Sequence, residues 1–428
     1  MKITAVGDFL IQKPYPADYS GFQTIRDYIG KGDARFVNLE TTLHEEGSCP
    51  AGAFSGGSYL RSDPEALNTA LAYGFNLLSN NNNHAFDFGT EGFLSTLDLI
   101  EKSGVAHAGT GLDLPSAAAP AYVDTPDGKA ALISVCASFT PPSPAGNPTK
   151  VYPGRPGINP LRYTQTICVT KEQGDVLRRI ALETGANRTA QILRREGYAP
   201  ALPDGVIEFS DLRLKVADRP GVENTFHAAD YKRVMNSVEE AKKRAAYVIL
   251  SLHNHCITGE KEEVPPFLRA FCHDAIDHGV GAVVCHGPHL LRGLELYKGC
   301  PIFHSLGDFV LQLGSIQSAP ADFYENVGVD ANLDIKELLR VRSDNGKRGL
   351  MYDRKMFETV IPCWEVENGK MTRFEMLPVE LGFDEKEERR GIPLPAKDLS
   401  FVQRFATLSA EFGTKMELQD GIVKVLLH

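Results

Sequence analysis

The stretch FNLLSNNNNHAFDFGTEGFLSTLDLIEKSG, residues 75–104, joins three different sequence patterns. FNLLS (75–79) has the apolar character of a buried strand, and GTEGFLSTLDLIEKSG (89–104) has the amphipathic spacing of a helix that ends at glycine. The asparagine residues between them favour a turn over a strand or a helix. A strand, a loop and a helix in succession predict a crossover unit of an α/β sheet.

The run of four asparagines before His84 has two interpretations. In the first, the run is a strand-to-helix turn that caps the following helix. In the second, it is a metal-binding loop, in which Asn83 offers a carbonyl oxygen and His84 an imidazole. The local sequence does not decide between them, and the rest of the chain has to be considered.

The same alternation of strands and helices continues on both sides of this stretch. Further strands are expected at residues 2–6, 35–40, 129–137, 247–253 and 280–286, and further helices at residues 63–74, 229–244 and 264–279. Strand-rich segments after residue 355 can complete a second sheet. We therefore predict an α/β fold with a four-layer α/β/β/α sandwich, in which two mixed sheets pack face to face between outer helices.

Two segments interrupt this alternation. TPPSPAGNPTKVYPGRPGINPLR (140–162) is dense in proline and glycine, so it is expected to be a long irregular loop, and a helical stretch follows it. A second segment, after the last of the regular strands, is polar. We expect a single domain over residues 1–428, with an irregular and helical insertion at about 140–228 and a polar excursion at about 313–355.

Composition limits the class of function. The chain has 428 residues and a net charge of -10 without a basic block, which argues against a nucleic-acid partner. It has no uninterrupted apolar run of about 18 residues and no leader pattern, so no membrane span and a cytoplasmic location are expected. The eight cysteines are scattered without a C-x-x-C pair, which excludes a disulfide framework or a zinc knuckle.

Polar side chains that can bind metals follow or end five of the expected strands. They are Asp8, Glu40, Asn83 with His84, His253 with His255, and His286 with His289. In open α/β sheets, ligands bind beyond the carboxyl ends of strands. Oxygen and imidazole ligands together suit zinc, manganese or iron. Any one of these residues alone is more often a cap or a turn, but the joint pattern predicts a metal site and favours the metal-binding interpretation of the asparagine run.

Several longer motifs resemble one known family. VGD, FVNLETTL, NNHAFDFGTEGFLSTLDLIEKSGVAHAGTG, VILSLH and HGPHLLRGLELYKGCPIFHSLGDFV are similar to the bacterial capsule-synthesis CapA family, which is associated with poly-γ-glutamate capsule formation. The resemblance covers about residues 1–312 and implies a fold like that of the calcineurin-type metallophosphoesterases. It implies that His84 is a proton donor or an oxyanion partner and that Glu40 is a bridging carboxylate. It also implies that one or two divalent metal ions are surrounded by Asp8, Glu40, Asn83, His253, His286 and His289.

The sequence departs from the phosphoesterase pattern at three positions. Leu10 stands where that pattern has a histidine, so one metal site lacks a ligand. His255 follows the VILSLH strand where family members continue with tryptophan and glycine, and we expect it to bind substrate or to act as a substitute ligand. Asp308 stands in SLGDF where asparagine is usual.

The proline-rich loop contains two candidate substrate-binding arginines. Arg155 and Arg162 lie in YPGRPGINPLR, and guanidinium groups suit carboxylates and phosphates. The alternative is a covering loop whose arginines pair with acidic side chains at the surface. His304, at the end of another expected strand, is a further candidate for the neighbourhood of the site.

Three functions are compatible with these features. The first is a metal-dependent hydrolase of phosphoesters, and the second is a metal-dependent hydrolase of γ-glutamyl or other amide bonds. The third is a non-catalytic binding or assembly component for an anionic polymer. The ligand set favours an enzyme with a small-molecule or anionic polymer substrate, whereas Leu10 in place of a histidine favours the third. The sequence does not give the oligomeric state.

Overall fold

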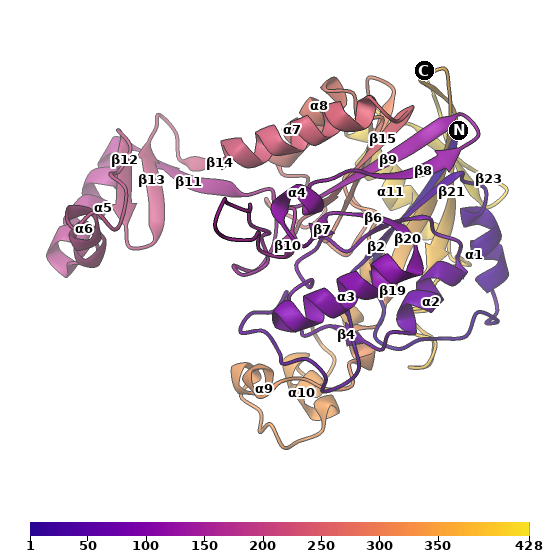
Figure 1. The fold of residues 1–428 in the computed structure, drawn as a ribbon, viewed down its shortest axis with the longest axis horizontal. Helices are drawn as coiled ribbons and strands as arrows, with labels where there is room; N and C mark the ends of the chain where they lie inside the picture. The colour runs from indigo at the N-terminus through magenta and orange to yellow at the C-terminus, as the bar shows by residue number, and fades with distance from the viewer. Residues whose placement is uncertain (428) are drawn as a thin grey trace. The chain divides into compact units, whose positions relative to one another are not determined.

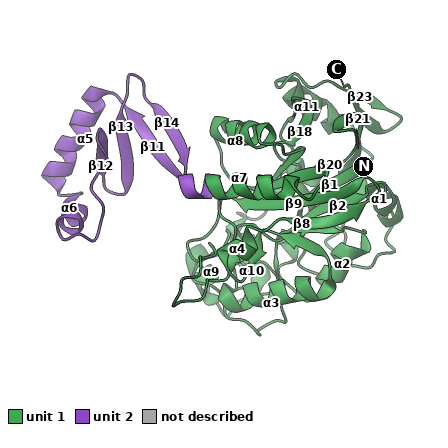
Figure 2. Cartoon of the chain, turned by 45° about the horizontal axis from the view of Figure 1, so that its top comes forward, with its two compact units in different colours: residues 1–160, 232–428 green, residues 161–231 purple. Residues whose placement is uncertain are grey.

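The computed structural model describes residues 1–427, and its chain divides into two compact units. The larger unit comprises residues 1–160 together with 232–428, and the smaller unit comprises residues 161–231 (Figure 2). The insertion expected at about 140–228 overlaps the smaller unit. The organisation of residues 1–428 as one domain stays a prediction.

The larger unit contains a ten-stranded mixed sheet, in the order β23-β24-β21-β20-β1-β2-β5-β6, with β19 beside β1 and β22 beside β21. Strand β1 runs parallel to β2 and β19 and antiparallel to β20. The strands are β1 (Lys2–Leu10), β2 (Ala34–Leu39), β5 (Leu77–Ser79), β6 (Ala106–Ala108), β19 (Asp308–Leu311), β20 (Glu358–Glu367), β21 (Lys370–Glu380), β22 (Leu394–Pro395), β23 (Met416–Gln419) and β24 (Ile422–Val425).

A second, six-stranded mixed sheet has the order β17-β18-β16-β15-β9-β8. Its four inner strands run parallel, and the two edge strands pair antiparallel with their neighbours. The strands are β8 (Ala121–Thr125), β9 (Gly128–Cys136), β15 (Tyr247–His253), β16 (Ala282–His286), β17 (Leu294–Tyr297) and β18 (Cys300–Phe303).

The two sheets share one buried hydrophobic cluster, which includes Ile3 and Phe36 from the first sheet and Ile249 and Val284 from the second. Because successive side chains of a strand point to opposite faces, the neighbouring residue Val37 belongs to another cluster, which includes residues of helices α1 (Phe22–Ile29) and α2 (Ala66–Ala72). The sheets therefore pack against each other on one face. In the central strands β2 and β15, every residue is buried except the half-buried Arg35.

Other helices of the larger unit are α3 (Gly89–Ser103), α4 (Leu114–Ala117), α8 (Pro266–Asp277) and α11 (Ser400–Ala410), and α7 (Ala228–Lys242) begins near the end of the smaller unit (Figure 1). Helix α8 contacts β16. Residues 313–357 form short helices: η1 (Leu313–Ser315), α9 (Ala321–Val327), α10 (Ile335–Arg342), η2 (Leu350–Tyr352) and η3 (Arg354–Phe357). Two small sheets pair β3 (Thr42–Leu43) with β4 (Arg61–Ser62) and β7 (Thr110–Gly111) with β10 (Gly157–Ile158). The predicted mixed α/β class with several mixed sheets is confirmed.

The smaller unit has its own four-stranded sheet, in the order β12-β13-β11-β14. Its elements are β11 (Tyr163–Val169), α5 (Lys171–Thr184), α6 (Arg188–Arg195), β12 (Val206–Phe209), β13 (Leu212–Val216) and β14 (Gly221–Phe226). Helix α5 begins with a capping box between Thr170 and Gln173, and a small core forms around Val169, Ile207 and Leu214. This unit therefore has a local core that does not depend on the metal-binding residues.

None of the helices in residues 1–427 has the length and apolar composition needed to cross a membrane. The cytoplasmic location stays a prediction.

Replacing Tyr247 with Phe should destabilise the contact between the two sheets. Trp364 on β20 donates its indole N–H to the Tyr247 hydroxyl on β15 at 3.0 Å, and that hydroxyl donates to the Gly281 carbonyl at 2.7 Å. The change leaves a buried N–H and a buried carbonyl without these partners, so the free energy of unfolding should fall by about 1–3 kcal/mol. Trp364 is the only tryptophan, so its fluorescence during urea unfolding measures the effect. The control is Tyr152→Phe, at an exposed tyrosine. Equal urea midpoints for Tyr247→Phe and Tyr152→Phe would contradict the predicted loss of stability.

Candidate metal centre

The candidate residues stand where strands of both large sheets end. Asp8 lies near the end of β1, and Glu40 directly follows β2. Asn83 lies in the loop after β5, and His253 and His286 are the last residues of β15 and β16. Their side chains come close together, as the contacts below describe. This is the position that parallel strands in α/β folds provide for ligands.

His253 is the centre of a buried group of imidazoles. Its Nδ1 lies 2.8 Å from Nδ1 of His286, and its Nε2 lies 2.7 Å from Oδ1 of Asn83 and 3.1 Å from Nε2 of His255. Burial lowers the pKa of His253 to about 4 and holds the pKa of His255 well below its usual range. His253 and His255 are therefore neutral at pH 7, which is the form that binds a metal ion.

Asp8 is fixed by donors from the surrounding backbone and side chains. Its Oδ1 accepts a hydrogen bond from Nδ2 of Asn38 at 2.7 Å, and its Oδ2 accepts one from the Gly287 amide at 2.8 Å. Burial alone raises its pKa, but His286, at 3.1 Å, and His253 hold the pKa of Asp8 well below its usual range. Asp8 is therefore an ionised carboxylate beside the imidazoles.

Glu40 is fully buried, and neither of its carboxylate oxygens has a hydrogen-bond partner among residues 1–427. Its Oε1 lies 3.6 Å from Nε2 of His253 and 3.8 Å from Nε2 of His84. Burial, followed by the charges of Asp8 and Asp308, raises the pKa of Glu40 well above its usual range. A buried carboxylate without a donor is costly unless a proton or a cation compensates it. A divalent metal fits this requirement.

Asp308 and His289 extend the cluster on the other side of Asp8. Nδ1 of His289 lies 2.9 Å from Oδ1 of Asp308, and Oδ2 of Asp308 is buried without a partner among the described residues. Burial raises the pKa of Asp308 to about 6, although the neighbouring His289 opposes this shift. Asp308 pairs with Asp8 in the register of β1 and β19. A second carboxylate oxygen in this cluster is thus open to a cation.

Three overlapping groups within this cluster could hold a metal ion, since the ligand atoms of each group lie within 4.8 Å of one another. They are Asp8, His253 and His286; Glu40, His253 and His255; and Asp8, His289 and Asp308. The structure thus brings together the side chains for which ligand roles were predicted: Asp8, Glu40, Asn83, His253, His286 and His289. Which of them bind metal stays a prediction.

His84 is oriented by a buried carboxylate. Its Nδ1 lies 2.6 Å from Oδ2 of Asp87, which also accepts a hydrogen bond from the Leu60 amide at 2.8 Å. A carboxylate accepts, so the Nδ1–H of His84 donates to Asp87 and Nε2 faces Glu40. Sequence reasoning missed Asp87, although its spacing from His84 in NHAFD was a usable signal.

The other asparagines of the run support the loop. The amides of Asn80 and Asn82 donate to the Leu39 carbonyl at 2.7 and 2.9 Å, so they tie the loop to β2. None of them caps α3, because its N-cap residue, Phe88, has no side-chain cap hydrogen bond. The helix-capping interpretation of the run is therefore wrong for α3. Asn83, in contrast, directs its carbonyl oxygen at His253.

The structure shows where the three residues that depart from the family pattern lie. Leu10 is buried in the hydrophobic core, so it offers no ligand where a histidine would stand. Asp308 lies beside Asp8. It was not predicted as a ligand because it is the first residue of β19, whereas the predicted ligands were taken from the ends of strands. His255, predicted to bind substrate or to substitute as a ligand, lies 3.2 Å from Oδ1 of Asn83. The unusual aspartate in SLGDF was the available signal for Asp308.

The two arginines predicted to bind substrate have partners within the protein. Arg155 donates from Nε and Nη2 to the Pro144 carbonyl at 3.2 and 3.0 Å. Within the smaller unit, Arg162 forms a two-point pair with Asp230 at 2.7 and 2.8 Å. Asp230 is a buried carboxylate and not the surface acid of the alternative interpretation. His304 pairs with Glu295 at 3.0 Å and belongs to none of the three metal-binding groups. The substrate-binding roles of Arg155 and Arg162 stay predictions.

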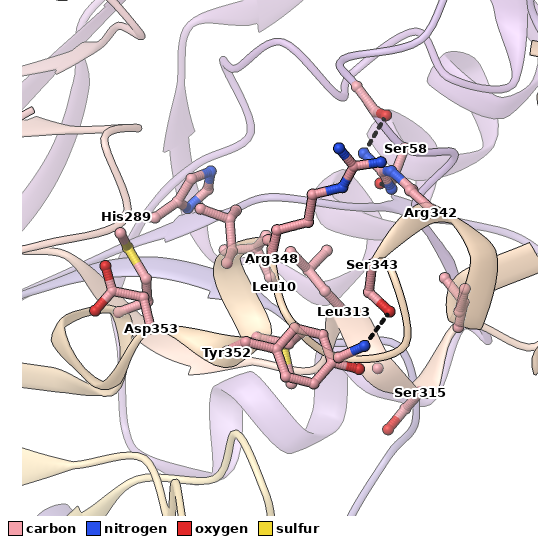
Figure 3. A pocket seen from close by; sticks show the side chains of 18 of the residues that line it. Leu10, Ser58, His289, Leu313, Ser315, Arg342, Ser343, Arg348, Tyr352 and Asp353 are labelled. Carbon is pink, nitrogen blue, oxygen red and sulfur yellow. Dashed lines mark hydrogen bonds between the residues drawn. The ribbon is translucent and has the colours of Figure 1, made fainter. Parts of the chain in front are cut away.

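A cavity of about 1350 Å³ adjoins the centre (Figure 3). Asn83, His84, His255 and His289 line it on the side of the centre. Its other walls come largely from residues 313–315 and 336–353. A substrate can therefore reach His84 and the metal-binding residues through this cavity.

The chain matches the family described as "Bacterial capsule synthesis protein PGA_cap" over residues 2–313. An uncharacterized protein, y4sH, of Sinorhizobium fredii (strain NBRC 101917 / NGR234) is 29% identical over 434 residues, which cover 98% of this chain and 92% of that protein. The PGA biosynthesis protein CapA of Bacillus subtilis (strain 168) is 27% identical over 156 residues, which cover 34% of this chain and 40% of that protein. The crystal structure of a hypothetical protein from Thermus thermophilus has a TM-score of 0.40 and 11% identity, with 89% of this chain and 99% of that chain covered.

Replacing Glu40 with Gln should stabilise the metal-free protein and destabilise the metal-loaded one. The folded-state pKa of Glu40 is raised above the ordinary 4.5, so its ionisation removes stability progressively as pH rises above that value. In chelator-treated protein at pH 7, the variant should melt ~2 °C or more above wild type, with no gain below pH 4.5.

Added zinc or manganese should reverse this order, because metal binding stabilises the protein that retains the Glu40 carboxylate more than the protein that lacks it. Thermal unfolding with and without metal measures both effects. Glu367→Gln, at the exposed end of β20, is the control and should follow wild type. If Glu40→Gln melts below wild type in the absence of metal, the claim that the Glu40 charge destabilises the metal-free protein is contradicted.

Proposed function

The chain belongs to the bacterial capsule synthesis protein family PGA_cap, and we propose that it acts as a metal-dependent hydrolase of phosphoesters. The observation that carries the proposal is the Glu40 carboxylate, which is buried without a hydrogen-bond donor among the carboxylate and imidazole groups of the centre. A protein that only binds a polymer has no need of such a costly group. An enzyme that holds a metal at this point does.

We assign the metal-binding role to two adjoining groups that share Asp8. His253 and His286 complete the first group with Asp8, and His289 and Asp308 complete the second. Glu40, Asn83 and His255 adjoin the first group through His253. Zinc, manganese or iron bound here supplies Lewis-acid activation of water and of a substrate oxygen. In this assignment Asp308 provides a carboxylate that offsets the missing histidine at Leu10.

His84 is the proposed proton donor. Its Nδ1–H is held by Asp87, which leaves Nε2 directed toward the centre and the cavity. Proton donation from Nε2 to a leaving oxygen requires an imidazolium, and the carboxyl groups of Asp87 and Glu40 lie 2.6 and 3.8 Å from the two ring nitrogens of His84. Asp87 therefore acts as a positioning residue through His84.

The proposed fold is the four-layer α/β/β/α sandwich of the metallophosphoesterase type. It is supported by the hydrophobic cluster that the two large sheets share and by the contacts of α1 and α2 with the other face of the first sheet. The contact of α8 with β16 supports a helical layer on the second sheet.

A second candidate function uses the same centre on γ-glutamyl amides. Lysine and arginine residues line the cavity, and guanidinium and ammonium groups bind carboxylates as well as phosphates. The Bacillus subtilis relative is named for PGA biosynthesis, which favours testing γ-glutamyl peptides beside phosphoesters. A non-catalytic role for an anionic polymer would use these cations but would not require Glu40.

The function is tested by turnover of phosphomonoesters, phosphodiesters and γ-glutamyl peptides by protein loaded in turn with zinc, manganese and iron. His84→Ala should keep its metal and lower turnover by about 10²–10⁴-fold, the range for a lost general acid. His286→Ala should lose metal, because it removes a ligand. Turnover and metal content per chain, measured on the same preparations, separate the two roles.

His278→Ala, at the C-terminal end of α8, is the matched control and should change neither quantity. If turnover survives His84→Ala intact, another group donates the proton. The hydrolase proposal fails if wild-type protein binds metal and turns over none of the substrates. Preferential turnover of γ-glutamyl peptides would replace the phosphoester function by the amide function.

A further inference from the structure

The cavity beside the metal centre has an excess of positive charge away from the centre itself. Lysine and arginine contribute seven of its lining residues, and aspartate and glutamate contribute three, in a chain whose net charge is -10. Five of the seven come from α10 and the segment after it, and we call them the cationic wall: Lys336, Arg340, Arg342, Lys347 and Arg348. This concentration of one sign of charge in a concave surface attracts anionic ligands.

The cationic wall is joined to the metal centre by the loop Gly56–Ser58. Arg342 donates to the Ser58 hydroxyl at 2.6 Å (Figure 3) and to the Gly57 carbonyl at 2.9 Å. On the other side of this loop, the Gly56 carbonyl accepts a hydrogen bond from Nδ2 of Asn83 at 2.8 Å. A side chain at Gly56 would lie 2.8 Å from the His84 ring, so the loop is in direct contact with the centre. One ligand can therefore touch both His84 and the wall.

Within the wall, Arg348 is available for a ligand. The Arg340 guanidinium pairs with Glu337, with a contact at 2.8 Å, and Arg342 is held by the Gly56–Ser58 loop. The Arg348 side chain is exposed and extends within the cavity, and its guanidinium has no hydrogen bond or ion pair to residues 1–427 (Figure 3). A guanidinium fork binds a carboxylate or a phosphate through two parallel hydrogen bonds.

We propose that Arg348 and the rest of the cationic wall form an anion subsite that binds a second anionic group of the substrate, a carboxylate or a phosphate, while the scissile bond lies at the metal centre. This inference rests on the proposed hydrolase function. It narrows the substrate class to molecules with an anionic group remote from the bond that is broken. The natural substrate is thus extended and carries at least two anionic positions when the scissile group is a phosphoester.

Three chromogenic phosphodiesters test the subsite: the methyl, carboxybutyl and phosphonobutyl esters of 4-nitrophenyl phosphate. The last two differ from the first by a remote carboxylate or a remote phosphonate. Arg348→Gln should lower the ratio of kcat/KM for a charged ester to kcat/KM for the methyl ester by about 5–20-fold, because a charge-assisted but solvent-exposed contact is lost. The effect should decrease as sodium chloride is added.

Arg26→Gln is the matched control. Arg26 is an exposed arginine on α1 that does not line the cavity, so its loss gives the same change of net charge and should leave the ratio as in wild type. A larger loss with the carboxybutyl ester identifies a carboxylate as the bound group, and a larger loss with the phosphonobutyl ester identifies a phosphate. The proposal is overturned if the ratio is unchanged in Arg348→Gln or falls equally in Arg26→Gln.

A binding experiment separates this proposal from the hydrolase function. Calorimetric titration of the full-length chain with tripolyphosphate and with a γ-linked triglutamate needs no turnover. Weaker binding by Arg348→Gln than by Arg26→Gln supports the subsite even if all three esters remain intact, in which case only the hydrolase function fails. Equal binding by both variants rejects the subsite whether or not the protein is an enzyme.

Discussion

The buried carboxylate of Glu40 is the constraint on which the rest of the centre depends. It lies close to two other buried carboxylates, Asp8 and Asp308, and no hydrogen-bond donor from the described residues reaches its oxygens. Transfer of a charge from water into such surroundings is unfavourable unless a proton or a cation compensates it. The neutral imidazole of His253 cannot supply that charge, but it can share a cation with Glu40.

The architecture explains how these groups are held together without a cation. The strands that carry them are covered on both faces, so their backbones are rigid and their polar ends meet at one place. Donors from Asn38 and Gly287 fix Asp8, and Asp87 fixes His84. The side chains of Asn80 and Asn82 attach the loop that carries Asn83 to β2. The centre is therefore preorganised by hydrogen bonds, and both oxygens of Glu40 and Oδ2 of Asp308 are left for a ligand.

The same loops connect the centre to the surroundings that select a substrate. The Gly56–Ser58 loop contacts Asn83 and His84 on one side and Arg342 on the other. A change in the segment that carries the cationic wall can therefore alter substrate preference without changing the metal-binding residues. Binding energy from a remote anionic group can also orient the scissile bond at the centre.

Short-range patterns in the sequence predicted much of this arrangement. The helix expected at 89–104 is α3, and the strand expected at 247–253 is β15, because apolar periodicity and a terminal glycine are local signals. The resemblance to the capsule-synthesis family, which is confirmed, added the set of candidate ligands.

Long-range pairings could not be derived in the same way. Asp308 reaches Asp8 only because β19 pairs with β1, and the sequence does not encode that register locally. Asp230 as the partner of Arg162, and the cavity-lining position of Arg348, likewise depend on tertiary contacts.

The most direct test of the account is anomalous diffraction from crystals of the protein loaded with zinc or manganese, recorded at the absorption edge of the added metal. The account predicts one or two anomalous peaks among Asp8, Glu40, His253 and His286, with ligand distances of about 2.0–2.2 Å for zinc. Crystals of metal-loaded protein with no peak at these side chains, and with Glu40 hydrogen-bonded to another group, would contradict it.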